Sequence, residues 1–453
     1  MASAPVPVNA QLRSDLHAEN RAIYLPAISK PFAVFVRDKA LPGSMPFVAS
    51  DLNFLDPASR MFHYPYALYS AGQHNTANAP EPDMVSQRDR TRTIVLGDSG
   101  GFQVSTIPGF FKQRMVIDNL RWMEQVADHS MVLDFPTGGI DLGNTQEHID
   151  RLTGEGHDLQ AINASNRLGL AYNACLLQTQ LNNDQFLKSR VPGATNFLNV
   201  LQGRSEKESK CWYEAVKHYP FEGWAFAGHH QNRFSLMLAR LIDMRDDGLL
   251  EKADWVHVLG VSVLPIGVLL TVVQRTIRKL YNPAIQFSFD TASAFRSGGA
   301  YQRMLSGATF DKHGWTIQYM APSSIGRSEE HRNLGDLLEE SLASEVRRRR
   351  VSRTAVSRVL TLGDLRDPAT GDLTEAGRNL LTHHNVEALI DAHDAAHDIW
   401  FDDPVVRDPL LSPRSVHFLA AFIETILEMP TDEAKAEIKK AAREYLDVLR
   451  PDV

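Results

Sequence analysis

The stretch TIVLGDSGGFQ, residues 93–103, decides the fold, because an unbroken apolar run ends at an aspartate and is followed by small residues. A strand without polar alternation is typical of a parallel sheet that is buried on both faces. Similar runs recur along the chain as SMVLD, NFLNVLQG, GWAFAG, WVHVLG and IQFSFD. The six runs end at Asp98, Asp134, Gln202 with Gly203, Gly228, Gly260 and Asp290.

The spacing of these endpoints predicts repeated βα units. Four of the five intervals are 26–36 residues long, and amphipathic stretches such as 118–129 and 233–248 lie between them. The 68-residue interval after Asp134 has room for two units or for an insertion. With FAVFV (32–36) and YALYSAG (66–72) as earlier strands, the count approaches eight. We therefore expect a (β/α)8 TIM-like barrel, with an open doubly wound sheet as the main alternative.

The character of the chain changes beyond the sixth of these strands. The segments around 295–324 read as loops with short strands, and the rest is charged and helical, ending in two amphipathic stretches at 412–429 and 431–449. We expect a barrel domain over residues 1–325 and a mainly helical region over 326–453.

Composition excludes several classes of protein. Among the 453 residues there are two cysteines, Cys175 and Cys211, which are too few for a disulfide framework or a multi-thiolate metal site. The N-terminus lacks the pattern of a secretory signal. The apolar segment 256–273 contains a histidine, a proline and two glycines, so it reads as a strand, a turn and a helix rather than a membrane span. We expect a cytoplasmic protein with no membrane partner.

The net charge of −8 argues against a broad electrostatic grip on nucleic acid. A local basic groove remains compatible with it. The stretch EVRRRRVSR, residues 345–353, is a candidate for phosphate contacts, with a solvated helix face as the alternative.

In a barrel the active site gathers at the carboxyl ends of the strands. Asp98, Asp134, Asp290 and Gln202 would then converge there. Any one aspartate alone is more often a helix N-cap, but capping does not explain the recurrence at successive strand ends.

Three other motifs give weaker indications of a functional site. GDSGGFQ lacks the spacing of a dinucleotide loop and the lysine of a Walker loop, so its glycines are expected to admit a flat ligand on which Phe102 stacks. AHDAAHD (392–398) imitates a zinc-protease helix, but we expect an exposed polar face. GHHQNR (228–233) is expected to place hydrogen-bonding histidines at a pocket rim. We expect no metal ligands in either.

In their order and spacing, DSGGFQ, VLD, VLQG, AG, LGV and FD resemble the tRNA-guanine transglycosylase superfamily over roughly residues 30–300. The resemblance implies exchange of a guanine in nucleic acid for a 7-deazaguanine through a covalent aspartyl-sugar intermediate. It implies Asp290 as the nucleophile and Asp98 as the acid/base. It assigns substrate binding to Ser99, Phe102, Gln103, Asp134, Gln202, Gly228, His229, Leu259, Gly260 and Arg296.

The implied base exchange requires residues of these types. A carboxylate nucleophile divides one difficult displacement into two easier ones, and a second carboxylate moves the proton of the departing and incoming bases. An aspartate that accepts from N1–H and the 2-amino group distinguishes guanine from adenine.

Two departures from the family pattern bear on cofactor and substrate. His384 occupies the place of a structural zinc ligand, but no cysteine follows Cys211, so we expect the zinc site to be lost and no cofactor to be needed. The segment TASAFRSGG after Asp290 lacks the usual proline. Both departures favour the branch that inserts 7-deazaguanines, such as 7-cyano-7-deazaguanine, into DNA, with protein partners of a DNA-modification system.

Three alternatives to this function stay open. The same exchange on tRNA is the nearest one. A non-catalytic nucleic-acid-binding paralogue is disfavoured by the presence of all three aspartates. A carboxylate-pair glycoside hydrolase accounts for Asp98 and Asp290 but not for the residues expected at the guanine edge.

Overall fold

The computed structural model describes residues 20–162, 164–342, 348–401 and 410–447. The N-terminal segment in which no secretory signal is expected lies outside the described residues, as do residues 345–347 of the arginine-rich stretch. No helix in the described ranges combines the length and the apolar character needed to cross a bilayer.

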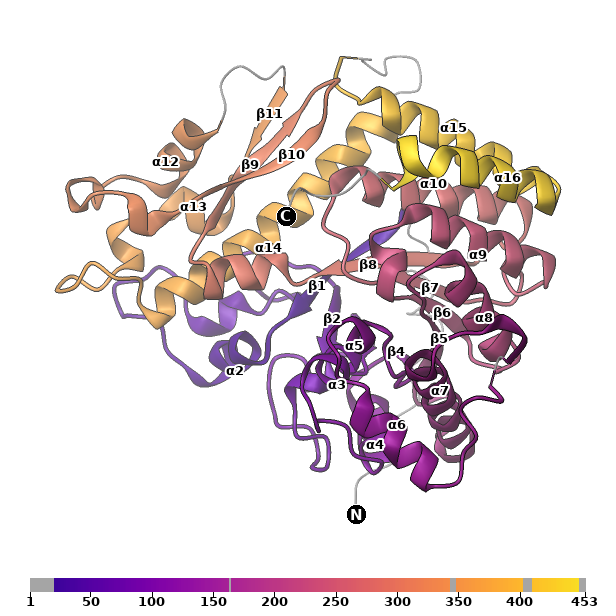
Figure 1. Cartoon of the computed structure of the whole chain (residues 1–453). Helices are drawn as coiled ribbons and strands as arrows, with labels where there is room; N and C mark the ends of the chain where they lie inside the picture. The colour runs from indigo at the N-terminus through magenta and orange to yellow at the C-terminus, as the bar shows by residue number, and fades with distance from the viewer. Residues whose placement is uncertain (1–19, 163, 343–347, 402–409, 448–453) are drawn as a thin grey trace.

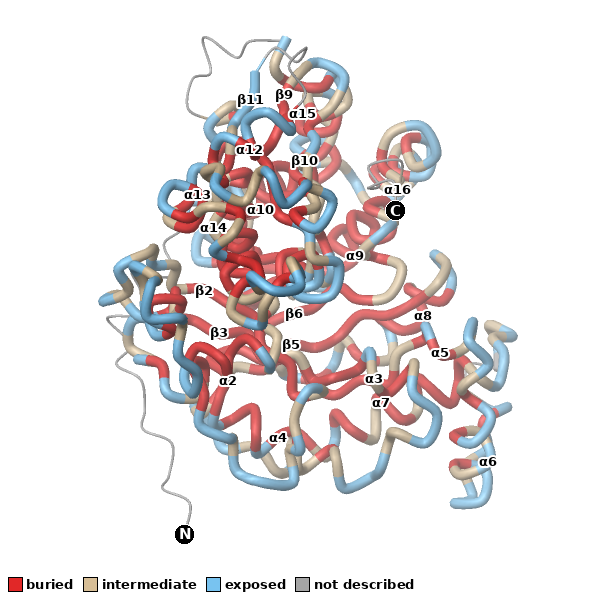
Figure 2. The backbone as a smooth tube through the Cα atoms, turned by 90° about the vertical axis from the view of Figure 1, so that its left-hand side faces the viewer, coloured by how far each residue is buried: buried red, intermediate tan, exposed pale blue. Residues whose placement is uncertain are grey.

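Eight parallel strands close into a barrel in simple sequence order, which confirms the expected (β/α)8 fold (Figure 1). The strands are β1 (Ile23–Ile28), β2 (Tyr66–Ser70), β3 (Ile94–Asp98), β4 (His129–Met131), β5 (Asn196–Leu201), β6 (Gly223–Phe226), β7 (Trp255–Val258) and β8 (Gln286–Thr291). The barrel closes where β1 pairs with β8, in a register that sets Leu25 opposite Asp290. Almost every strand residue is buried, which explains why the sequence shows apolar runs instead of alternation (Figure 2).

Helices cover the outside of the barrel (Figure 1). They are α2 (Lys30–Asp38), α3 (Gly101–Thr106), α4 (Met115–Val126), α5 (Gly138–Asp141), α6 (Gln146–Gly154), α7 (Leu170–Ser189), α8 (Glu206–Val216), α9 (Phe234–Asp246), α10 (Leu264–Leu280) and α11 (Ser293–Phe295). The segment 256–273 is the end of β7, a turn and the start of α10, as predicted.

One predicted strand is wrong. FAVFV lies in α2, which begins with Pro31 at its first turn and buries Phe32, Ala33, Phe35 and Val36 on one face. The first strand is instead IYLPAI, which is not among the predicted strands and contains Pro26, a residue that is uncommon inside strands. YALYS forms β2 as predicted.

The long interval between β4 and β5 is an insertion. Its described residues form the helices α5, α6 and α7 and contain no strand.

Beyond the barrel, three strands form an antiparallel sheet in the order β10-β9-β11. The sheet joins strands on both sides of residue 325, where the domain boundary is expected. The elements of this region are β9 (Met304–Phe310), β10 (Trp315–Met320), α12 (Leu334–Ser341), β11 (Arg348–Val351), α13 (Ala355–Val359), α14 (Glu375–Phe401), α15 (Arg414–Glu428) and α16 (Thr431–Ala441). The predicted C-terminal helices therefore correspond to α15 and α16.

Helix α14 runs between the barrel and this sheet, in contact with β1, α10 and β9 (Figure 1). The expectation of an exposed polar face on AHDAAHD is therefore wrong, because His393 and His397 are buried against the barrel wall. His393 stacks on Tyr24 of β1, and His397 bonds Thr271 of α10.

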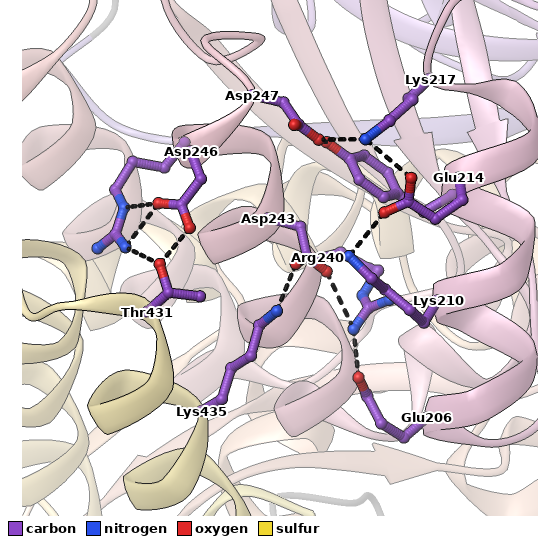
Figure 3. A network of polar contacts seen from close by, with 12 residues as sticks. Glu206, Lys210, Glu214, Lys217, Arg240, Asp243, Asp246, Asp247, Thr431 and Lys435 are labelled. Carbon is purple, nitrogen blue, oxygen red and sulfur yellow. Dashed lines mark hydrogen bonds and ion pairs between the residues drawn. The ribbon is translucent and has the colours of Figure 1, made fainter.

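Helices α15 and α16 pack on α10 and α9. A charge network joins α8, α9 and α16 (Figure 3). At its centre Asp243 pairs with Lys210 of α8, with Arg240 of its own helix and with Lys435 of α16. The C-terminal helices are therefore fastened to the outer layer of the barrel by charge as well as by apolar contact.

Candidate functional site

The barrel brings the three predicted aspartates to its mouth, by which we mean the carboxyl ends of β1–β8. Asp98 is the last residue of β3, Asp134 follows β4, and Asp290 lies near the end of β8. Their charges act on one another, since Asp290 raises the pKa of Asp98 and Asp98 raises that of Asp134. Three carboxylates thus share one region, as strand-end placement predicted.

Asp98 is the half-buried member of the group. Ser70, at the end of β2, donates a hydrogen bond to it, and the Gly100 amide lies 3.3 Å from Oδ1. Burial is the main cause that raises its pKa, and the negative charge of Asp290 adds to the effect. A carboxyl group in this setting holds its proton more readily than a free aspartate.

Asp290 is held by strand β7 and the turn that follows it. The Gly260 amide donates to Oδ1 at 2.9 Å, and His257 Nε2 lies 3.2 Å from the same oxygen. Gly260 has a φ of 67°, a left-handed conformation that aims its amide at the carboxylate with little strain for glycine.

Asp134 and Gln202 form a pair, with Gln202 Nε2 donating to Asp134 Oδ2 at 2.8 Å. Burial raises the pKa of Asp134 to about 7, against the lowering effect of the Gln202 bond. Gly228, at the end of β6, approaches so closely that a Cβ there would lie 2.4 Å from Gln202 Oε1. These residues therefore lie together beyond the ends of β4, β5 and β6.

The DSGG glycines have a packing role in this structure. Gly100 has a φ of 83°, and a Cβ there would lie 2.7 Å from Gly72 Cα. A Cβ on Gly101 would meet Asp134 Oδ1 at 3.1 Å. The two glycines therefore let the loop after β3 pack against the loop after β2 and against Asp134.

The remaining predicted residues differ in exposure. Phe102 is 71% exposed and therefore has a free aromatic face. Ser99 is buried, and its carbonyl accepts from Asn119. Gln103 has a buried Oε1 with no hydrogen-bond partner among the described residues. Arg296 is exposed and bonds the Tyr301 hydroxyl at 2.6 Å.

His229 and Leu259 are both half-buried, on the segments after β6 and β7. The neighbouring His230 has a structural part, because its ring bonds Ser209 and the Ala227 carbonyl at 2.8 Å each. Of the two histidines expected at a rim, only His229 is accessible.

His257 is the residue that sequence reasoning missed. It is fully buried in β7, between Asp290 and the Ser288 hydroxyl. A signal existed, because His257 is the single polar residue inside the apolar run WVHVLG, and a buried polar group needs a partner.

His384, at the position that the resemblance implies for a zinc ligand, has no ring nitrogen free to bind a metal ion. Both ring nitrogens of His384 are occupied, one by Thr354 Oγ1 at 2.6 Å and the other by the Leu305 carbonyl at 2.8 Å. Among the described residues there is no group of three or more histidine, cysteine or acidic side chains placed to hold a metal ion.

No protein-family model and no curated protein sequence matches this chain. Assignment of a function therefore rests on the residues at the barrel mouth.

Proposed function

We propose that this protein is a base-exchange transglycosylase that replaces guanine in DNA with a 7-deazaguanine. The observation that carries the proposal is the placement of Asp98 and Asp290 at the ends of β3 and β8, where the charge of Asp290 raises the pKa of Asp98. Asp290 accepts from the Gly260 amide and lies 3.2 Å from His257 Nε2, as suits a carboxylate, whereas burial raises the pKa of Asp98, as suits an acid. Two carboxyl groups in contrasting environments suit the nucleophile and the acid/base of a double displacement.

In the first displacement, a lone pair of Asp290 forms a bond to C1′ of the sugar while the C1′–N9 bond breaks. The electron pair of that bond leaves with guanine, which takes the proton of Asp98 at N9. In the second, Asp98 removes the N9 proton of the incoming 7-deazaguanine, N9 attacks C1′, and the Asp290 carboxylate is released. Protons and charges balance over the two steps, and no cofactor enters either.

The pair of Asp134 and Gln202 supports recognition of guanine. Oxygens of Asp134 can accept from N1–H and the 2-amino group, and adenine cannot supply both donors. Exposed Phe102, in the first turn of α3 shortly after Asp98, offers a ring face on which a base can stack.

The basic strand β11 supports a polymeric substrate. Arg348, Arg349 and Arg350 are exposed on it, and it pairs with β9, the strand that continues from the segment after Asp290. Phosphate contacts from such a strand would position nucleic acid beside the barrel. A base in a duplex has to be turned out of the stack to reach the mouth.

The decisive experiment incubates the protein with labelled 7-cyano-7-deazaguanine and either duplex DNA or unmodified tRNA. We expect label in DNA. Label in tRNA alone would support the same exchange on the other polymer, and label in neither would favour a non-catalytic paralogue.

Asp290→Asn tests the nucleophile. The amide oxygen can still accept from Gly260 and His257, so the fold should be kept, but an amide cannot form the sugar ester. We expect exchange to fall below detection, whereas exposed Asp432→Asn on α16 should leave it unchanged. Near-normal turnover by Asp290→Asn would show that the nucleophile is another residue.

A further inference from the structure

A chain of buried polar groups lies directly behind Asp290. Trp255 and His257 of β7 and Ser288 of β8 are all fully buried. Trp255 Nε1 lies 2.6 Å from Ser288 Oγ, which lies 2.8 Å from His257 Nδ1. The other ring nitrogen, Nε2, lies 3.2 Å from Asp290 Oδ1. The strand register places His257 beside Ser288, so the pairing of β7 with β8 determines the contact between these two side chains.

The donors and acceptors of this chain can be assigned from one end. The indole of Trp255 can only donate, so Ser288 Oγ accepts from it. The hydroxyl hydrogen of Ser288 then has His257 Nδ1 as its partner, which makes Nδ1 the acceptor. The ring hydrogen therefore sits on Nε2 and is donated to Asp290.

The opposite tautomer is disfavoured on two counts. It would turn the Nε2 lone pair toward the Asp290 carboxylate, and it would leave the Ser288 hydrogen without an acceptor among the described residues. Both are costly in a fully buried site, where an unmade hydrogen bond carries its whole desolvation penalty.

We propose that His257 is a positioning residue, locked by Ser288 as its Nε2–H tautomer, and that it anchors Oδ1 of Asp290 so that Oδ2 is the oxygen that bonds to the sugar. The catalytic part of this inference rests on the proposed function. Oδ1 accepts from both His257 and Gly260, whereas Oδ2 has no hydrogen bond from the described residues.

The anchored oxygen also fits the covalent intermediate. When a lone pair of Oδ2 forms the bond to C1′, the electron pair of the broken C1′–N9 bond leaves with the base, and Asp98 supplies the proton. Oδ1 then becomes the carbonyl oxygen of the sugar ester and keeps its two donors. Neither donor has to move during the reaction, so the carboxyl plane stays fixed in both steps.

The tautomer is tested without any substrate. Long-range proton–nitrogen NMR on protein labelled with ¹⁵N-histidine distinguishes a ring protonated at Nε2 from one protonated at Nδ1. The signal of His257 is identified as the one that disappears in His257→Gln. We expect the Nε2–H pattern, changed to a mixture in Ser288→Ala. An Nδ1–H pattern in the unmodified protein would overturn the assignment.

The positioning role is tested by kinetics on two variants. Glutamine at 257 can still donate from its side-chain amide, whereas leucine cannot. We expect His257→Leu to lower kcat about 10- to 100-fold with KM for the base little changed, and His257→Gln to recover most of the loss. An equal loss in both variants, with circular dichroism like that of the parent, would overturn the donor role.

The tautomer and the catalytic role of His257 can fail separately. Absence of exchange on both DNA and tRNA by the parent protein would refute the proposed function and the catalytic role of His257 with it. The NMR pattern would still decide the tautomer.

Discussion

At the scale of single residues, Asp134 shows the clearest conflict between the stability of the fold, which burial of a charge lowers, and the proposed role in binding guanine, which requires that charge. A carboxyl group that is 4% exposed, with the Gln202 amide as its side-chain hydrogen-bond partner, is poorly placed to carry charge. Burial raises its pKa to about 7. A bound ligand that supplies further hydrogen-bond donors, as the edge of guanine does, would stabilise the charged form of this carboxylate.

This conflict predicts the pH dependence of stability at Asp134. An unfolded aspartate titrates near pH 4, so between about pH 4 and 7 the folded state binds more protons than the unfolded state at this residue. Its contribution to the free energy of unfolding therefore falls as pH rises through that range. Asp134→Asn removes the charge, so we expect it to exceed the parent in stability by up to about 4 kcal/mol at pH 8 and to match it near pH 4.

Urea unfolding of both proteins at pH 4, 6 and 8 checks this, because titrating groups that do not interact with Asp134 cancel in the difference. Exposed Asp432→Asn serves as the control and should show a much smaller change with pH. A gap for Asp134→Asn that stays constant with pH would contradict the expectation.

How far the sequence predicts the site also becomes clear at single residues. Asp98, Asp134, Gln202 and Asp290 are predictable, because each ends an apolar run and parallel strands bring such ends to one edge. His257 escapes prediction, because its role depends on a cross-strand neighbour. The register that sets it beside Ser288 is a property of the closed barrel and cannot be read from β7 alone.

At the scale of elements, the network of α8, α9 and α16 predicts a large effect of a single charge (Figure 3). Arg240 is fully buried, and Asp243 is one of its two carboxylate partners. Asp243→Asn leaves the guanidinium with Glu206 alone and deprives Lys435 of its partner. Breaking a buried pair costs about 3–5 kcal/mol, so we expect a loss of this size in the free energy of unfolding.

Asp246→Asn on the same helix is the matched control for Asp243→Asn. Its side chain is 40% exposed, and exposed pairs contribute about 1 kcal/mol or less. Chemical denaturation of both variants measures the contrast. A loss for Asp243→Asn no larger than that of the control would mean that the buried pairs of Asp243 contribute no more than the contacts of Asp246 with Arg245 and Thr431.

Elements also show where pattern reading fails. FAVFV is apolar throughout, which suits either a short buried strand or part of a buried helix, and only the helix fits Pro31 at the start of α2. The burial of His393 and His397 in α14 could not be foreseen either, because it depends on the packing of that helix against β1 and α10. Long apolar runs that end at a polar residue, by contrast, can be predicted as strands from the local sequence alone.

At the scale of the whole molecule, the negative net charge conceals a local concentration of positive charge. The chain carries a net charge of −8, yet β11 exposes Arg348, Arg349 and Arg350 in succession at the edge of the C-terminal sheet. An acidic protein repels a polyanion at long range, so binding would depend on this local strand. The proposed function therefore requires β11 to supply part of the affinity for nucleic acid.

A double variant of β11 tests that requirement. Replacing Arg348 and Arg349 by serine should weaken binding to duplex DNA of any sequence, because phosphate contacts carry no base information. The dependence of log K on log salt should become shallower by about one for each phosphate that the variant no longer binds. Lys439 and Lys440 on α16, replaced together by serine, remove the same charge away from the sheet and should leave the slope unchanged. Fluorescence anisotropy at several salt concentrations measures both slopes, and equal slopes for the two double variants would place the nucleic-acid contact on another face.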